Sequence, residues 1–349
     1  MRTRRTFLKN MAYAGAFVLC QSPYSAAQSA RKEVRIAGLR VKVVDIHAHC
    51  GFRAVEQVVR GTPQEMTVSD NRILGPHWFE WIDERGIDIQ ALSINQYWWY
   101  SAAEDLARRI TRVQDEAMAE WCAKHPDRFV GLSSVALQHP ELAAEQLEYA
   151  VKELGLRGAS IGGHVEGGVP STARFDPFWA KVEELGVPVF MHPDNAKNID
   201  RDAVLRRADL GGVIGNPLET TVFLTHLIID GTLDRFPGIK VCAAHGGGFL
   251  PSYLGRTEVT CESRRDTDCA KKLPSEYLKT QIFADSMVFS EEGLRHLVAE
   301  MGVSQIVYGT DIPFIWPDTL DLILNASFLN NEEKEAIVGG NLVKLLRIT

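Results

Sequence analysis

Residues 41–49 read VKVVDIHAH, an apolar run that ends in two histidines separated by one residue. Side chains two positions apart on a β-strand point to the same side of it. His47 and His49 would therefore present two imidazoles to one face, close enough to share a metal ion. The competing interpretation is a pair of polar residues on the wet face of a strand, and the rest of the chain distinguishes the two.

Seven further short apolar runs follow the first one, and segments with helical periodicity separate them. Continuous apolar runs are typical of parallel strands that are buried on both faces. The eight predicted strands are 41–47, 87–94, 129–137, 158–161, 188–192, 240–245, 281–284 and 305–309. The predicted helices between them are 104–124, 141–154, 176–185, 217–235 and 291–301. Glycines that follow several of these helices are typical stop signals.

This alternation predicts an α/β fold of the (β/α)8 TIM barrel type. A long insertion is expected at 51–85, after the first strand, and two further helices at 318–347, at the end of the barrel. The alternative is an open, doubly wound sheet with a glycine-rich phosphate loop after its first strand, where this chain has His-Ala-His instead. We therefore predict one barrel domain over 41–349, preceded by a linker over 28–40.

The first 27 residues differ in character from the rest of the chain. Arg4 and Arg5 precede Phe-Leu-Lys, a mild apolar run covers 11–20, and a small-residue cleavage site lies at 25–27. This pattern predicts a signal peptide of the twin-arginine type and export to the periplasm. The apolar run is too short to span a bilayer, so we expect no membrane span in the mature protein. The alternative is a frayed basic N-terminus.

Composition and charge narrow the class of protein further. The chain has 349 residues, of which 45% are hydrophobic and 24% charged, and its net charge is −7. That is enough apolar material for one large core, and no basic stripe indicates nucleic-acid binding. Cys20 would leave with the signal, and the five remaining cysteines form no metal-site pattern. Cys261 and Cys269 could pair in the periplasm, whereas Cys242 is expected in the core.

Polar residues gather where the predicted strands end, which is the face at which barrel enzymes carry their active sites. His192 follows the fifth strand and Asp311 follows the eighth. Two or three histidines with one carboxylate suit zinc, and also manganese or iron. We expect one divalent ion, with zinc ahead of manganese, held by His47, His49, His192 and Asp311, and no organic cofactor.

Further strand ends supply candidates for catalysis and substrate binding. His245 precedes three glycines and could act as a general base or proton donor, as another ligand, or as a structural histidine. Asp285 could orient the substrate or relay a proton, or cap a helix together with Ser286. His164 could contact the substrate or cap its strand. Trp98 and its two aromatic neighbours could form a wall for a flat substrate or simply contribute to packing.

Taken together, these motifs resemble the amidohydrolase-related (amidohydrolase 2) family, and most closely its aminocarboxymuconate-semialdehyde decarboxylase group. The segments that carry the resemblance occur in family order over about residues 43–346. They are VDIHAH at 44–49, GASIGGHV at 158–165, FMHP at 190–193, GNPLETT at 215–221, the stretch from FP at 236 through HGGG at 245–248 to GR at 255–256, and YGTDIPF at 308–314.

The resemblance implies roles for individual residues. The four ligands named above match the family's metal ligands, and His245 matches the histidine that acts on the metal-bound water. Arg256 matches an arginine that enters a neighbouring subunit's site and holds the substrate carboxylate, which implies a homodimer. The family also has a second substrate arginine in the insertion. Arg72 lies near that position but does not align with it, and Arg53 is the alternative candidate. The compared group also has a histidine at the position of Phe289.

Three functions are compatible with these residues. The leading hypothesis is a metal-dependent, non-oxidative decarboxylase of an unsaturated or aromatic carboxylic acid, with substrate contacts from Arg256, Arg72, His164, Trp98 and Asp285. A hydrolase of a lactone, ester or amide could use the same site. The third possibility is a periplasmic protein that binds a metal or solute without catalysis. The mass of the product separates the first two, because one reaction loses CO₂ and the other gains water.

Overall fold

The computed structural model describes residues 31–95, 97–200, 204–263 and 270–348. The proposed signal at 1–27 lies outside these residues, and so does Cys269 of the suggested cysteine pair, so both stay predictions. Within the described part of the chain, none of the helices combines the length and the apolar character that crossing a membrane requires.

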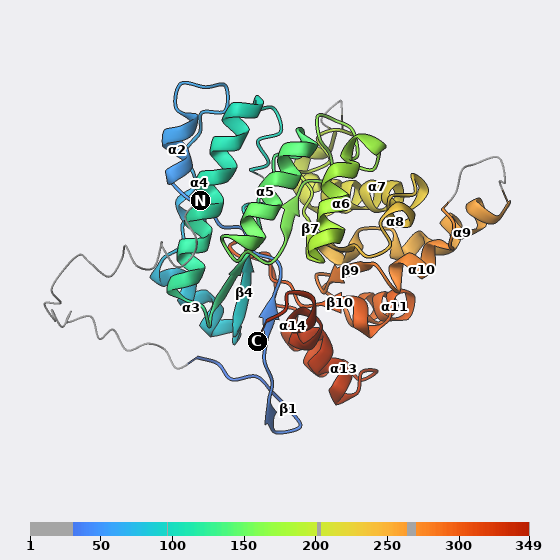
Figure 1. Ribbon diagram of the computed structural model, residues 1–349. Coiled ribbons are helices and arrows are strands. Elements are labelled where there is room, and N and C mark those ends of the chain that lie inside the picture. Colours follow the sequence, from blue (N-terminus) through green and yellow to red (C-terminus); the bar gives the residue numbers. More distant parts are fainter. Residues whose placement is uncertain (1–30, 96, 201–203, 264–269, 349) are drawn as a thin grey trace, which may run out of the picture.

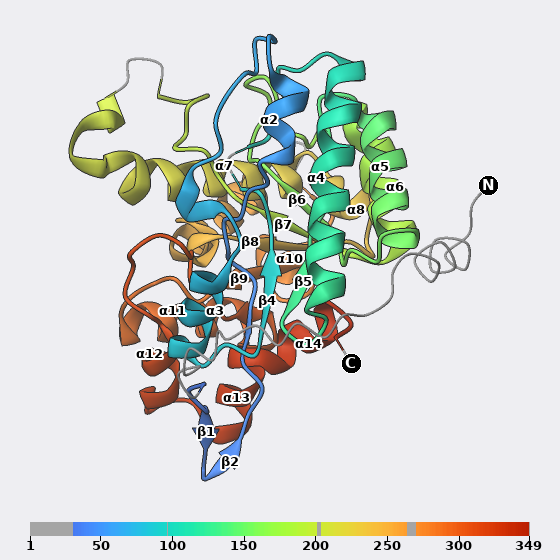
Figure 2. The same cartoon turned by 90° about the vertical axis from the view of Figure 1, so that its left-hand side faces the viewer.

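Parallel strands in chain order form the centre of the molecule (Figures 1 and 2). They are β3 (Val44–Asp45), β4 (Ile89–Leu92), β5 (Phe129–Gly131), β6 (Ala159–Ile161), β7 (Pro188–Met191), β8 (Lys240–Ala243), β9 (Ile282–Asp285) and β10 (Ile306–Val307). One sheet has the order β3-β4-β5 and the other β6-β7-β8-β9-β10. Bridges between Ser133 and Ala159 and between Ala48 and Ile312 join the two sheets at both seams. The predicted (β/α)8 barrel is confirmed.

Helices follow the strands and cover the outside of the barrel. They are α2 (Ala54–Val59), α3 (Pro76–Arg85), α4 (Glu104–Lys124), α5 (Pro140–Lys152), α6 (Asp176–Leu185), α7 (Asn216–Ile229), α8 (Thr232–Arg235), α9 (Leu254–Ser263), α10 (Pro274–Leu278) and α11 (Glu291–Met301). Figure 2 shows α4, α5 and α6 side by side on one flank. The predicted helix 217–235 divides into α7 and α8, because Gly231 between them has a left-handed φ of 70°.

Short helical turns shape the loops at the ends of the strands. They are η2 (Asp70–Arg72), η3 (Ala173–Phe175), η4 (Val204–Asp209), η5 (Gly211–Gly215), η6 (His245–Gly247), η7 (Pro251–Tyr253) and η8 (Val303–Gln305). The predicted insertion at 51–85 is shorter than expected, since α3 within it is the helix that connects the first two strands of the barrel. Only the segment with α2 and η2 is additional.

The strands are shorter than the apolar runs that predicted them. The run at 129–137, for example, is a strand only over Phe129–Gly131. Val135 and Leu137 lie beyond the strand, yet both are buried. Their apolar character therefore reflects burial in a loop that packs on the barrel and not an extended backbone, which periodicity alone does not separate.

The segment predicted as a linker at 28–40 contains a folded element. β1 (Arg35–Ile36) and β2 (Leu39–Arg40) pair as an antiparallel hairpin. Ala37 and Gly38 at its turn have φ values of 50° and 82°, the positive values that a two-residue hairpin turn requires. Arg40 also reaches Asp88 at 2.6 Å. The last residues of the segment predicted as a linker therefore form a hairpin, and an ion pair attaches it to the barrel.

Two apolar layers hold the barrel together. Val189 and Met191 of β7 face the helices, whereas Phe190 between them faces the barrel interior. The chain after β10 forms α12 (Leu320–Asn325) and a continuous run of α13 (Asn331–Glu335), η9 (Ala336–Gly340) and α14 (Asn341–Leu345). Leu342 and Leu346 belong to the interior cluster and close the barrel at one end. Polar side chains lie at the other end of the barrel, where the strands finish.

Candidate metal centre

Four buried side chains meet where three of the barrel strands end. His47 and His49 follow β3, His192 follows β7 and Asp311 follows β10. One ligand atom from each lies within 4.8 Å of all the others, and the four residues are at most 4% exposed. The structure thus brings together the residues that the sequence singled out as metal ligands.

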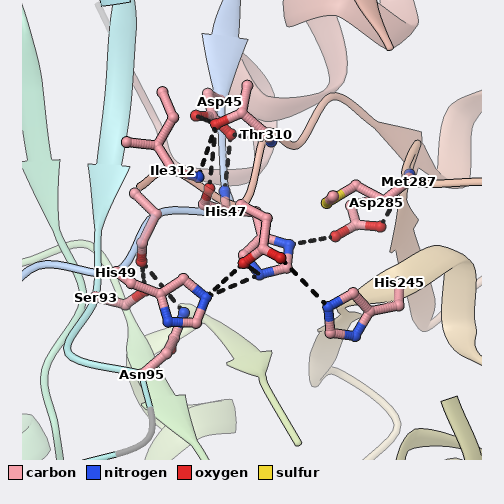
Figure 3. Close-up of polar contacts among 12 residues, drawn as sticks. Asp45, His47, His49, Ser93, Asn95, His245, Asp285, Met287, Thr310 and Ile312 are labelled. Carbon is pink, nitrogen blue, oxygen red and sulfur yellow. Dashed lines mark hydrogen bonds and ion pairs between the residues drawn. The ribbon is translucent and has the colours of Figure 1, made fainter. Parts of the chain in front are cut away.

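The contacts within this cluster need a positive charge at its centre. Nε2 of His47 and Nε2 of His49 are 3.3 Å apart (Figure 3). Oδ1 of Asp311 lies 3.0 Å from the first and 2.6 Å from the second. Nδ1 of His47 donates to Oδ2 of Asp285 at 2.7 Å, so Nε2 is the ring atom that would share a proton or a metal ion with Asp311. A divalent cation between Nε2 and the carboxylate would take the place of that proton and be coordinated by both. The residues present therefore fit a metal ion.

Protonation equilibria in the cluster agree with this interpretation. Burial lowers the pKa of His49 to about 4, against the attraction of Asp311. Burial also holds the pKa of His192 well below its usual range. For Asp311, burial favours the neutral acid, but the charges of His47 and His49 hold its pKa well below the usual value. Two neutral imidazoles and one carboxylate are the forms that bind a divalent metal.

Asp285 lies behind His47 and is fully buried. Its Oδ1 accepts hydrogen bonds from the backbone amides of Gly246 at 2.9 Å and Met287 at 3.2 Å. Burial is the largest single influence and would raise the pKa of Asp285, but the hydrogen bond and charge of His47, together with His245 and the amide of Gly246, outweigh it and keep the pKa below its ordinary value. The structure therefore places Asp285 against the ring of His47, which it would orient, while its contact with a substrate stays a prediction.

Asp45 is a second supporting carboxylate, which the sequence did not single out although it belongs to the same VDIHAH stretch. Its Oδ1 accepts from the amide of His47 at 2.9 Å, and its Oδ2 accepts from the hydroxyl of Thr310 at 2.6 Å (Figure 3). Oδ2 also accepts from the side-chain amide of Gln90 at 2.7 Å. Asp45 thus ties the end of β3 to β4 and to the segment after β10, close to three of the four ligands.

His245 lies at the rim of the cluster, directly after β8. Its Nε2 is 3.9 Å from Oδ2 of Asp311, and its ring centre is 5.2 Å from that of His47 and 5.1 Å from that of His192. The side chain is 15% exposed, in contrast to the buried ligands. His245 also has a left-handed φ of 56°, a strained conformation that is typical of functional sites. This position suits proton transfer to a bound molecule better than ligation.

Arg72 reaches the centre from the segment after β3. Its side chain is buried, and Nη1 donates to the carbonyl of Asn95 at 2.9 Å. The guanidinium lies 5.0 Å from the ring centre of Tyr97 and 5.6 Å from that of Phe314. Phe314 in turn contacts the ring of His49 edge-on at 4.9 Å. A cation and an aromatic face therefore adjoin the ligands, and Phe314 is a further contact that only the YGTDIPF segment could have suggested.

Arg53, the rival candidate, faces away from the centre. Half of its side chain is exposed, and it bonds to Asp70 and to Glu56 of the same surface segment. Of the two arginines in this part of the chain, Arg72 is the one that the structure brings to the metal ligands.

His164 and Trp98 line a cavity of 280 Å³ beside the ends of β6 and β7. Trp98 packs on Gly162, where a Cβ atom would lie 2.9 Å from its ring, and it stacks on Tyr100 at 6.3 Å. The hydroxyl of Tyr100 accepts a hydrogen bond from the amide of Gly162 at 3.1 Å. Tyr100 therefore serves packing, while Trp98 and His164 form a wall next to the ligand-bearing strands.

Arg256 and Phe289 lie farther out. Arg256 is exposed on α9, which projects from the body of the barrel, and is not brought to the metal ligands of the same chain (Figure 1). Phe289, at the position where the compared group has a histidine, is 43% exposed and stacks on Trp316 with ring centres 5.5 Å apart. An aromatic pair thus replaces a polar side chain in the loops that follow β9 and β10.

Comparison with known proteins agrees with this architecture. A model of the family described as amidohydrolase matches residues 44–348. The chain belongs to the amidohydrolase family. One curated relative is the 2-amino-3-carboxymuconate-6-semialdehyde decarboxylase of Dictyostelium discoideum, which is 33% identical over 74% of this chain and 73% of its own length. A gamma-resorcylate decarboxylase of Rhodococcus jostii is 32% identical over 67% of this chain and 75% of its own length.

Solved structures show the same fold. The 5-carboxyvanillate decarboxylase from Sphingomonas paucimobilis superposes with a TM-score of 0.81 at 22% identity, over 88% of this amidohydrolase and all of that chain. A dihydroxybenzoic acid decarboxylase from a Polaromonas species, solved with bound manganese and the inhibitor 2-nitroresorcinol, superposes with a TM-score of 0.76 at 25% identity. Its match covers 88% of this chain and 97% of that one.

Proposed function

We propose that this amidohydrolase is a metal-dependent, non-oxidative decarboxylase that acts on an unsaturated or aromatic carboxylic acid. The observation that carries the proposal is the arrangement around the metal centre. His245 lies on one side of Asp311, and the buried Arg72 with the ring of Phe314 lies beside His49. This combination offers a proton, a carboxylate-binding cation and an aromatic contact to one small molecule. The relatives with decarboxylase names add independent support.

The reaction needs one proton and releases one CO₂. A protonated His245 would deliver its proton from the ring to the substrate carbon that bears the carboxylate. The bond from that carbon to the carboxylate then breaks, its electron pair restores the diene or ring, and CO₂ leaves. A bound divalent ion would supply electrophilic polarisation of the substrate. Asp285 keeps His47 oriented throughout, because its hydrogen bond fixes the ring.

Substrate recognition is assigned to residues that adjoin the ligands. Arg72 would hold the carboxylate, since a planar guanidinium binds it through two parallel hydrogen bonds. The substrate ring would lie against Phe314. Trp98 and His164 would contact the far end of a larger substrate from the neighbouring cavity.

The metal is proposed to be zinc, with manganese as the alternative. Three imidazoles and one carboxylate are a nitrogen-rich set that suits zinc. Manganese is present in several solved neighbours of similar fold. Elemental analysis of protein purified without added metal decides between the two ions.

A homodimer is proposed in which Arg256 of one subunit enters the site of the other. Phe249, Tyr253 and Val259 lie close to Arg256 in sequence, on or just before α9, and are 36%, 62% and 60% exposed. Apolar side chains of this size in one projecting segment are typical of an interface. Mixing R256A with H245N tests the proposal, because a mixed dimer would regain one complete site. Recovery of activity on mixing is expected, and activity that stays at the level of the single variants contradicts the exchange.

Export to the periplasm by the twin-arginine route remains a proposal from residues 1–27. Cell fractionation of the wild-type chain and of R4K/R5K tests it. The wild type is expected in the periplasmic fraction and the variant in the cytoplasm, since the lysines remove the paired arginines that the route reads.

The reaction itself is tested with metal-loaded protein and a panel of hydroxybenzoates and unsaturated dicarboxylates. Release of CO₂ with a product lighter by its mass is expected. A product heavier by one water from a lactone or ester panel, together with no CO₂ from the acids, would instead establish a hydrolase.

A further inference from the structure

The loop that directly follows the ligand His192 is held by one carboxylate from another element. Oε2 of Glu219 accepts hydrogen bonds from the backbone amides of Asp194 at 2.9 Å and Ala196 at 2.8 Å. Glu219 lies in the first turn of α7 and is only 1% exposed. The carboxylate of Glu219 is thus buried, and it accepts hydrogen bonds from the main-chain amides on either side of Asn195.

A second side chain of the same helix turn completes the contact. Oδ1 of Asn216 accepts from the amide of Asn195 at 2.7 Å, so three consecutive amides of the loop bond to α7. Asn216 and Glu219 are three residues apart, a spacing that places side chains on the same face of a helix. Close backbone approach supports the contact, since a Cβ atom on Gly215 would lie 2.8 Å from the carbonyl of Asn195.

The loop backbone is strained and would not keep this shape unaided. Asn195 and Ala196 have φ values of 57° and 54°, in the left-handed region that alanine rarely adopts. Such conformations persist where the surroundings determine them. Successive amides in this type of backbone form a concave site for an anion. Here the anion is the side chain of Glu219.

Glu219 also contacts the neighbouring strand end. A Cβ atom on Gly163 would lie 2.7 Å from Oε1 of Glu219 and 2.5 Å from the Cε of Met191. Glycine is therefore required at this position to let the carboxylate approach the loop that carries His164. Burial raises the pKa of the Glu219 carboxyl to about 7, and the amides of Asp194 and Ala196 oppose that rise.

The orientation of the His192 ring depends on the loop that follows it more than the orientation of the His47 ring depends on the residues after it. The ring of His47 is oriented by the hydrogen bond from Nδ1 to Asp285. Nδ1 of His192, by contrast, is buried and has no hydrogen-bond partner among the described residues. The described residues offer this atom no hydrogen bond of the kind that Asp285 forms with His47, so packing and the backbone that continues into the loop 194–196 set the orientation of the ring.

We propose that Glu219 is a positioning residue of the metal centre, which fixes the ring of His192 by holding the amides of Asp194 and Ala196 in the loop that follows it. The proposal rests on the metal centre and not on the decarboxylase reaction. Glu219 does not touch the ion or the substrate, and acts only through the loop. Asn216 shares the role through the central amide.

Cobalt(II) substitution tests the proposal, because the visible spectrum of cobalt reports the geometry of its ligands. E219A removes the oxygen that accepts both hydrogen bonds, so we expect cobalt affinity to fall by about 10- to 100-fold, as for other residues that orient ligands, with a shifted spectrum. E219Q keeps the shape and one acceptor oxygen but loses the charge, so an intermediate change is expected. Formate added to E219A should restore the wild-type spectrum by refilling the anion site.

D115N is the matched control. Asp115 is also a buried carboxylate on a helix, where it bonds to the hydroxyl of Ser133 and to the amide of Ser134 at 3.2 Å, but it has no contact with the loop 194–196. Its substitution should leave the cobalt spectrum unchanged. Wild-type affinity and spectrum in both Glu219 variants would overturn the proposal, as would an equal spectral change in D115N. Failure to release CO₂ from any acid would overturn the reaction proposed above but not this assignment.

Discussion

Oδ2 of Asp285 lies 2.7 Å from Nδ1 of His47, while the opposite nitrogen of that ring faces Oδ1 of Asp311 at 3.0 Å. One imidazole therefore separates two carboxylates, one behind it and one on the side of the ion. The rear carboxylate fixes the tautomer of the ring and raises its strength as a ligand. Burial opposes a charged His47, but Asp311 and Asp285 outweigh it and raise the pKa of His47 to about 10.

D285N is expected to lower the affinity for the divalent ion by about 10- to 100-fold. An asparagine keeps the size but removes the charge that stabilises the Nδ1 proton of His47. Competition with a chelating dye measures the affinity directly. D318N is the control, since Asp318 accepts from the hydroxyl of Tyr308 at 2.7 Å and touches no ligand. Unchanged affinity in D285N would contradict the role of the rear carboxylate.

H245N is expected to keep its metal and lose its turnover. His245 is the partly exposed ring beside the ligands, and loss of a general acid or base lowers kcat by about 10²- to 10⁴-fold. Metal content by elemental analysis and kcat on the same preparation provide the two readouts. H226N serves as the control, because His226 is an exposed residue of α7 that pairs with Asp230. Loss of the metal together with activity would make His245 a ligand instead.

R72K is expected to raise KM about tenfold or more with a smaller effect on metal content. Lysine keeps the charge but loses the planar fork that binds a carboxylate and the stacking against Tyr97 and Phe314. R53K is the matched control, since Arg53 is half exposed and pairs with surface acids. Steady-state kinetics on both variants decide the assignment, and equal KM values for R72K and wild type would remove Arg72 from the substrate site.

D115N is expected to stabilise the fold more at pH 8 than at pH 5. Burial raises the pKa of Asp115 to about 7, against hydrogen bonds from Ser133 and Ser134. A carboxyl with a raised folded-state pKa contributes most stability at low pH and progressively less as the pH rises toward 7. The neutral asparagine avoids that loss, so the free-energy gap between variant and wild type should shift by about 3 kcal/mol between the two pH values.

Urea denaturation of both proteins at pH 5 and pH 8 measures this shift. A gap that does not change with pH would show that the buried carboxyl titrates as it does in the unfolded chain.

The sequence predicted the helices best where one face is clearly apolar. The residue ranges expected for α4, α6 and α11 agree with the structure. Amphipathic periodicity and the glycines after α6 and α11 define these segments locally. The lengths of the strands were overestimated, because residues such as Val135 are apolar and buried but lie in a loop beyond the strand. The hairpin of β1 and β2 was missed because its attachment depends on an ion pair to Asp88, far along the chain.

The ligand set could be predicted because parallel strands in a barrel finish at one face, so that His47, His192 and Asp311 converge wherever the strands are placed correctly. The residues that support the metal ligands could not be predicted from the sequence. Asp45 and Glu219 bond to groups on other elements, and no spacing in the sequence encodes those partners. The choice of Arg72 over Arg53 likewise required the burial of one side chain and the exposure of the other.

The two sheets of the barrel meet at the bridge between Ala48 and Ile312, and the metal ligands flank that bridge. His47 and His49 belong to the edge of one sheet, and Asp311 belongs to the edge of the other. A bound ion would therefore link the two sheets across this seam. By mass action, its binding free energy would add to the stability of the whole folded barrel. We expect a cell starved of the metal to lose the protein itself to proteolysis, so that its abundance would report the supply of the ion.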